Sequence, residues 1–126
     1  NKDASDQNDK LNVCVRTSLK HMETQLQNME DAKYKLSDLQ FDGRSEKLRK
    51  LSIDELAEKI SELAEMKTSM KKVLFEKQHI EHTNAKIDIL SKAGALLNEC
   101  KEIQSDSQKI INRAHGDASS CRGSVC

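Results

Sequence analysis

The sequence predicts an all-α protein, an antiparallel bundle of three to four long amphipathic helices stapled by two disulfides. The 126 residues include no proline and only four glycines, the two residue types that most disfavour helix interiors. Aromatic residues make up 2% of the chain and charged residues 33%, which favours long helices over sheets. Apolar residues also recur at steps of three, four and seven over long stretches, which is the spacing of one helical face.

The first helix is expected to follow a polar leader. The chain has the length of one domain with a single core, so we expect one helical domain over residues 1–126. Residues 1–9 carry no apolar repeat, which predicts a flexible leader, and Asp9 is the expected cap of the helix. The helix should end at Asp42 and Gly43, because Asp-Gly is a strong turn signal. Its apolar face repeats every seven residues at Val15, Met22, Met29 and Leu36.

The second helix carries the stripe that the rest of the bundle is expected to cover. Ser52 and Glu55 form a capping-box pair, which predicts that the helix begins at Ser52. We expect it to run to about His82 and then turn, because an unbroken helix to Ala114 would be about 95 Å long. Residues 44–50 are either a short separate helix or an extension of this one. Its apolar face consists of Ile53, Leu56, Ile60, Leu63, Met70 and Leu74.

The third helix has an apolar stripe wide enough to face two neighbours. It is expected to end after His115 at Gly116, because glycine suits a left-handed cap and histidine suits the negative end of the helix dipole. Residues 117–126 then form a disulfide-tied tail. The stripe comprises Ile89, Leu90, Ala93, Leu96, Leu97, Cys100, Ile103, Ile110 and Ile111.

The cysteines are Cys14, Cys100, Cys121 and Cys126. An even number of cysteines in a short chain predicts two disulfides and secretion into an oxidising compartment, with buried free thiols as the alternative. A start at Asn1 rather than Met is consistent with a mature secreted chain. Four cysteines allow three connectivities. If the tail returns to the start of the first helix, Cys14 pairs with Cys121. Cys126 then pairs with Cys100.

The charge balance bears on the class of partner. Lys plus Arg and Asp plus Glu number 21 each, so no net charge attracts nucleic acid or an anionic membrane. No apolar stretch approaches the roughly 20 residues that cross a bilayer. Four lysines form a basic strip that is a candidate contact surface for an acidic protein partner, although such runs also occur as solvated helix faces. They are Lys67, Lys71, Lys72 and Lys77.

The residues do not predict an enzyme, a cofactor or a metal centre. Glu76 and His79 have the Glu-x-x-His spacing of di-iron bundles, but those proteins need a second copy of the motif. His79 and His82 alone would be a poor zinc site, which needs more protein ligands. The glycines are isolated, so no phosphate-binding loop is predicted, and no serine lies in a Gly-x-Ser-x-Gly elbow.

Cys14 early in the first helix, Cys100 in the last helix and the closing stretch from Ser120 to Cys126 give the chain a recognisable layout. Together with its size and helical character, this layout resembles the small salivary proteins of anopheline mosquitoes, the family that contains anophensin and albicin. The resemblance implies a secreted, non-enzymatic inhibitor of host defence in saliva. Albicin-like members block the alternative complement pathway by binding the C3 convertase complex. Anophensin-like members block contact activation, the factor XII and kallikrein-kinin system, and bradykinin release.

Three functional hypotheses follow. The first is a monomeric binding protein that inhibits the alternative complement convertase, for immune evasion. The close alternative is an inhibitor of the contact pathway, which would affect haemostasis. A hypothesis of a different class is a structural helical oligomerisation module, because heptad repeats also suit association between chains.

Overall fold

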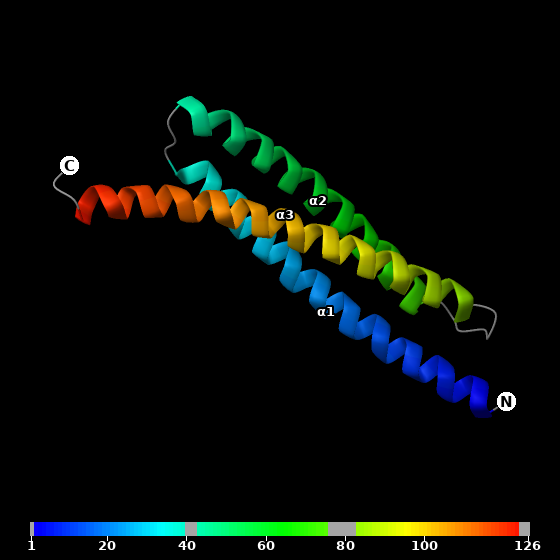
Figure 1. Ribbon diagram of the computed structural model, residues 1–126. Helices are drawn as coiled ribbons and strands as arrows, with labels where there is room; N and C mark the ends of the chain where they lie inside the picture. Colours follow the sequence, from blue (N-terminus) through cyan, green and yellow to red (C-terminus); the bar gives the residue numbers. More distant parts are fainter. Residues whose placement is uncertain (1, 40–42, 76–82, 124–126) are drawn as a thin grey trace.

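The computed structural model describes residues 2–39, 43–75 and 83–123, with side chains over 6–39, 45–74 and 84–114. The described residues form three helices and no strand: α1 (Lys2–Asp38), α2 (Gly43–Phe75) and α3 (Thr83–Gly123). Each helix packs against both others, and α2 runs antiparallel to α1 and α3 (Figure 1). The predicted all-α fold is confirmed, with three long helices.

The predicted flexible leader is wrong, because α1 already begins at Lys2. Its polar first turns have a use in the fold: Asn8 and Asn12 accept hydrogen bonds from Lys86 of α3. Apolar periodicity missed this segment, and the contact that Asn8 makes with α3 is polar.

The predicted helix start at Ser52 is also wrong. Helix α2 begins at Gly43, so residues 44–50 extend it, and Ser52 lies buried in its interior. There the backbone amides are bonded within the helix, and a capping box has no unpaired amide to serve. The early turns are held by Arg49, which pairs with Glu46 and whose Nη1 donates to the carbonyl of Leu36 at 3.3 Å. That bond satisfies one of the last carbonyls of α1.

The predicted break between the first two helices is confirmed, since α1 ends at Asp38 and Gly43 begins α2. Asp42 lies outside the described residues. The fold-back before the third helix is also confirmed. Helix α2 ends at Phe75 rather than at the expected His82, and residues 76–82 lie outside the described part of the chain.

The predicted end of the third helix at Gly116 is wrong, because α3 continues to Gly123. A glycine inside a helix costs about 1 kcal/mol relative to alanine, which weakens the helix without ending it, and no proline follows to stop it. Residues 117–123 are therefore the last part of α3 rather than a tail.

The core repeats every seven residues in all three helices. In α1 the predicted line at sevens is buried throughout, whereas in α2 Leu56, Leu63 and Met70 are buried and Ile53, Ile60 and Leu74 are half-buried against the core. Three of the four methionines are buried. In α3 the buried line differs: Ile89, Leu96, Ile103 and Ile110 are only half-buried and flank it. The fully buried positions at sevens are Lys86, Ala93, Cys100 and Ser107, together with Ile111. Small side chains on this line let α3 lie close to its neighbours.

Two polar contacts set the register between α1 and α3. Lys86 Nζ donates to Oδ1 of Asn8 and of Asn12, both at 2.7 Å. Gln25 Nε2 donates to Gln104 Oε1, also at 2.7 Å. The paired residues lie 74 to 79 positions apart in sequence. Because a buried polar group that slipped out of register would lose its partner, these contacts favour one alignment of the helices.

The described fold places Cys14 and Cys121, one of the predicted disulfide pairs, far apart along the bundle. In a bundle of three helices α1 and α3 run parallel, so the end of α3 lies far from the start of α1 (Figure 1). The register places Cys121 more than about 40 Å further along the bundle than Cys14, whereas a disulfide needs Cα atoms within about 7 Å. Among the described residues Cys14 has an exposed free thiol and Cys100 a buried one. Cys126 lies outside the described residues.

Candidate functional site

The predicted basic strip is only partly available as a contact surface. Lys71 and Lys72 are exposed near the end of α2, as expected. Lys67 is half-buried, with its Nζ 3.3 Å from Oε1 of Glu23 in α1, so it contributes to packing between two helices. Lys77 lies outside the described residues. The exposed part of the strip, among the residues that the structure describes, is therefore the pair Lys71 and Lys72 near the end of α2.

A more extended surface lies on the opposite edge of α2, where it meets α3. A shallow groove of about 490 Å³ follows this seam, and we call it the α2–α3 groove. Its apolar part comes from Met66 and Leu96, which are half-buried against the core. Its sides come from Glu62, Glu65 and Ser69 of α2 and from Lys92, Ala95 and Glu99 of α3.

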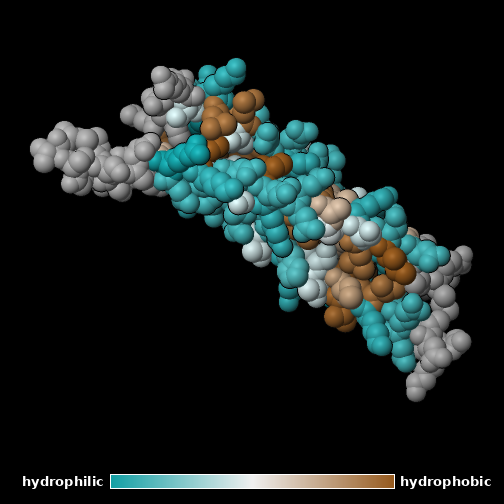
Figure 2. Space-filling view, in the orientation of Figure 1, coloured by the Kyte–Doolittle hydropathy of each residue, from teal (hydrophilic) through white to brown (hydrophobic). Residues whose placement is uncertain are grey.

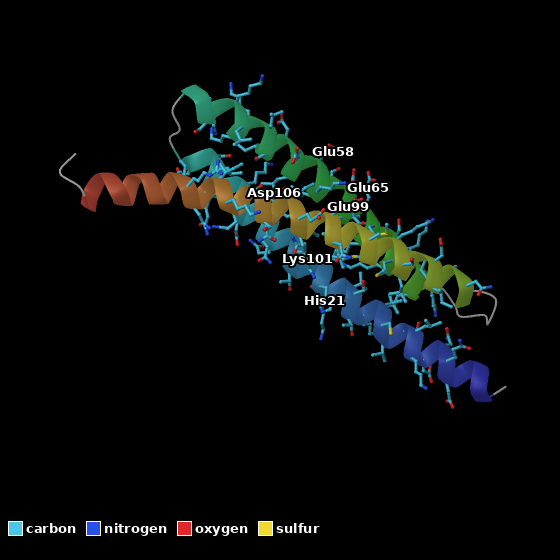
Figure 3. The ribbon with its side chains drawn as sticks, in the orientation of Figure 1. His21, Glu58, Glu65, Glu99, Lys101 and Asp106 are labelled. Carbon is cyan, nitrogen blue, oxygen red and sulfur yellow. The ribbon has the colours of Figure 1, made fainter. Side chains whose placement is uncertain are left out.

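Helical spacing explains the acidic edge of this groove. Glu58, Glu62 and Glu65 follow one another at steps of four and three, so they line one face of α2. Glu99 joins them from α3, and Figure 3 shows Glu58, Glu65 and Glu99 on the same side of the molecule. A second shallow hollow of about 510 Å³ on α2 shares Glu65 with the groove and widens the surface. The glutamate spacing was visible in the sequence, but the contribution of α3 required the fold.

One lysine bridges two of the groove glutamates. Lys59 Nζ lies 2.9 Å from Oε2 of Glu62 and 3.1 Å from Oε2 of Glu99, so it links α2 to α3. Its hydrogen bonds, first to Glu62 and then to Glu99, raise the pKa of Lys59 well above its ordinary value. Lys59 is thus fully charged at neutral pH, and it offsets part of the negative charge of Glu62 and Glu99.

The groove nevertheless keeps a negative edge. Lys92 lines the groove, but its ion pair is with Asp88, 3.0 Å away, rather than with a groove carboxylate. Glu65 makes no ion pair with any described residue. A negative edge around an apolar centre is suited to a partner that presents an apolar side chain flanked by lysine or arginine.

The buried line of α3 contains two titratable side chains. Burial raises the pKa of the Cys100 thiol to about 11, so it is neutral near pH 7 and a poor nucleophile. Burial lowers the pKa of Lys86, an effect partly opposed by the negative charge of Asp9. Both groups lie inside the bundle, where they shape packing rather than contact a partner.

The other residues considered as sites from the sequence lie mostly outside the described part of the chain. The described residues contain no group of three or more histidine, cysteine or acidic side chains arranged to hold a metal ion. Glu76, His79 and His82 lie outside those residues, as do the side chains of Cys121 and Arg122. Among the three described helices, none is long and apolar enough to span a membrane.

Searches of protein-family models, of curated proteins and of solved structures found no match for this chain.

Proposed function

We propose that this protein is a secreted, non-enzymatic inhibitor of host defence in the saliva of a blood-feeder, acting on the alternative complement pathway by binding the C3 convertase complex. The cysteine layout and its resemblance to the anopheline salivary family supply the biological part of the proposal. The observation that carries the binding part is the α2–α3 groove, an apolar seam edged by Glu62, Glu65 and Glu99.

The shape of the groove favours a protein partner over a small molecule. Pockets for small ligands are concave and enclose most of the ligand, whereas this groove is shallow and lies along two long helices. Protein interfaces combine an apolar centre with a charged, solvent-accessible rim. Met66 and Leu96 supply the centre, and the glutamates supply a rim that would speed association with a basic partner.

Inhibition of the contact pathway is the second candidate. Exposed Lys71 and Lys72 at the end of α2 favour this alternative, because they would attract an acidic surface instead. The structural oligomerisation module is supported less well. The heptad residues of α1 and α2 that would mediate coiled-coil association are buried inside one chain, for example Met22, Leu56 and Leu63.

Secretion also implies an oxidised protein, and we keep two disulfides as part of the proposal. The register separates Cys14 from Cys121 in the described fold, so bonding between them would require the end of α3 to fold back along the bundle. Mass spectrometry of the secreted protein without reduction would count the bonds. A count of four free thiols would contradict secretion into an oxidising compartment.

The test of function compares two assays on the same oxidised protein. Lysis of rabbit erythrocytes in serum measures the alternative complement pathway, and kallikrein generation in plasma measures contact activation. We expect inhibition of lysis at concentrations that leave kallikrein generation unchanged. Inhibition of kallikrein generation alone would favour the second candidate, and no effect in either assay would refute both.

Charge reversal then tests the surface. The double variant Glu65→Lys and Glu99→Lys should lose at least about tenfold in potency, because it places like charge opposite a basic partner. The variant Lys71→Glu with Lys72→Glu should retain potency. Glu30→Lys is the matched control, since Glu30 is exposed on α1 and far from the groove in sequence. Equal potency of all three variants would show that the groove is not the contact surface.

A further inference from the structure

Large apolar side chains are exposed near the start of α2. Leu48 is 45% exposed and Leu51 is 52% exposed, and Figure 2 shows hydrophobic atoms at the surface in this part of the molecule. Both leucines line a shallow groove of about 360 Å³ between the first turns of α2 and the later part of α3, which we call the end groove. Half-buried Ile110 lies between the two helices there.

The charges of the end groove are arranged in two groups along the bundle. Glu55 and Asp106 lie on the side nearer the middle of the bundle, and Arg113 lies beyond the leucines on the side nearer its end. This order follows from the antiparallel run of α2 and α3, because higher numbers in α3 are level with lower numbers in α2 (Figure 1). Lys109 lies toward the basic side. Its Nζ is 3.9 Å from Oδ1 of Asp106, which is a long distance for an ion pair.

Such a surface is complementary to itself. A two-fold axis perpendicular to the helices brings the acidic side of one copy against the basic side of the other, and the reverse at the second end. The leucines of both copies then meet at the centre. A two-fold interface requires each surface patch to match its own rotated copy, and an apolar patch between opposite charges satisfies this requirement.

We propose that the end groove is the site at which two copies of this chain pair antiparallel to form a homodimer. The occupant is a second copy because the charges within the patch balance: Glu55 and Asp106 match Lys109 and Arg113. A partner of one charge sign would meet repulsion at one of the two sides. The proposal goes beyond the binding function above, since it uses a different surface, and it replaces the monomer expected from the sequence.

Leucine substitutions give the first test, in which sedimentation velocity measures the dimer of the intact protein. Leu51→Glu should weaken dimerisation by at least about tenfold, because each copy loses the burial of one leucine and places a carboxylate in the centre. Leu48→Glu should act in the same direction. Ile87→Glu is the matched control, because Ile87 is 47% exposed at the opposite end of the bundle. All three positions are exposed, so helicity by circular dichroism should not change.

Charge exchange gives the sharper test. The variant Lys109→Glu with Arg113→Glu has two acidic sides, and the variant Glu55→Lys with Asp106→Lys has two basic sides. Each variant alone should be monomeric, because like charges meet at both ends. An equal mixture should form a heterodimer, since opposite charges meet again at both ends.

Specific results would overturn the proposal. These are a wild-type protein that stays monomeric at high concentration, dimers that survive Leu51→Glu, or a mixture of the two charge variants that stays monomeric. Rescue in the mixture, together with weaker dimerisation at high salt, would support it. Loss of dimerisation with full inhibitory potency would separate this proposal from the proposed function, which would then stand unchanged.

Discussion

Ser107 provides the clearest test of how the helices pack. Its side chain is 1% exposed on the buried line of α3, and its hydroxyl oxygen has no hydrogen-bond partner among the described residues. A buried hydroxyl without a partner has lost its bonds to water and gained none in exchange. We therefore expect Ser107→Ala to increase the free energy of unfolding.

The expected magnitude combines three effects. Removing an unsatisfied buried polar group stabilises a protein by about 1 to 3 kcal/mol. Alanine also favours a helix over serine by about 0.5 kcal/mol. The small void left by the oxygen opposes these gains, because cavities in a core reduce stability. The net gain should be about 1 to 2 kcal/mol, which corresponds to a rise in Tm of about 4 °C for each kcal/mol in a chain of this size.

The assay is urea denaturation followed by circular dichroism, with Ser105→Ala as the matched control. Ser105 is exposed on the same helix, so its substitution measures the helix propensity alone and should gain about 0.5 kcal/mol. The excess of Ser107→Ala over the control is then the contribution of burial. If Ser107→Ala gains no more than the control, or lowers the stability, the proposed packing of α3 is incorrect.

Three further predictions concern groups that differ in burial. Lys86→Ala should lower the free energy of unfolding by about 3 kcal/mol or more, because it leaves a cavity and unpaired amide oxygens, whereas Lys86→Met should cost less. Because burial lowers the pKa of Lys86, the stability of the wild type relative to Lys86→Met should rise with pH as the buried ammonium loses its proton; a pH-independent difference would contradict this. Lys59→Met should cost about 1 kcal/mol, less at high salt, since its ammonium bridges two helices. The raised pKa of Lys59 means that this contribution holds through neutral pH and is lost only in strong alkali, as denaturation at several pH values would reveal. In the reduced protein, a thiol reagent in mild alkali should label exposed Cys14 rapidly and buried Cys100 only after unfolding, and equal labelling rates would refute the burial of Cys100.

The heptads of α1 could be predicted because they depend on local geometry. Val15, Met22, Met29 and Leu36 are all buried, as their spacing required. The ends of the helices were harder to predict. Ser52 has the residue type and spacing of a cap, but the turns before it are continued by Arg49, whose partner in α1 is distant in sequence. The helix therefore begins before the residue with the local capping signal, because a tertiary contact stabilises the earlier turns.

The candidate surfaces depended still more on the fold. The steps between Glu58, Glu62 and Glu65 predict an acidic face on one helix, but the groove exists only where that face meets Leu96 and Glu99 of α3. The basic strip fared less well, because Lys67 lies between two helices in the folded chain. Exposure of a charged residue depends on which neighbour covers it, and the periodicity of one helix does not contain that information.

The sequence by itself determined that this chain is helical and that its apolar residues line one face of each helix, because both follow from the spacing and conformational preference of neighbouring residues. Only the tertiary structure decided which buried line of α3 faces the core, how Lys86 and Gln104 fix its register, and why Cys14 lies far from Cys121. The physical reason is the direction of the helices. Three helices leave the start of α1 and the end of α3 at opposite ends of the bundle, and direction is a property of the packed chain rather than of any segment.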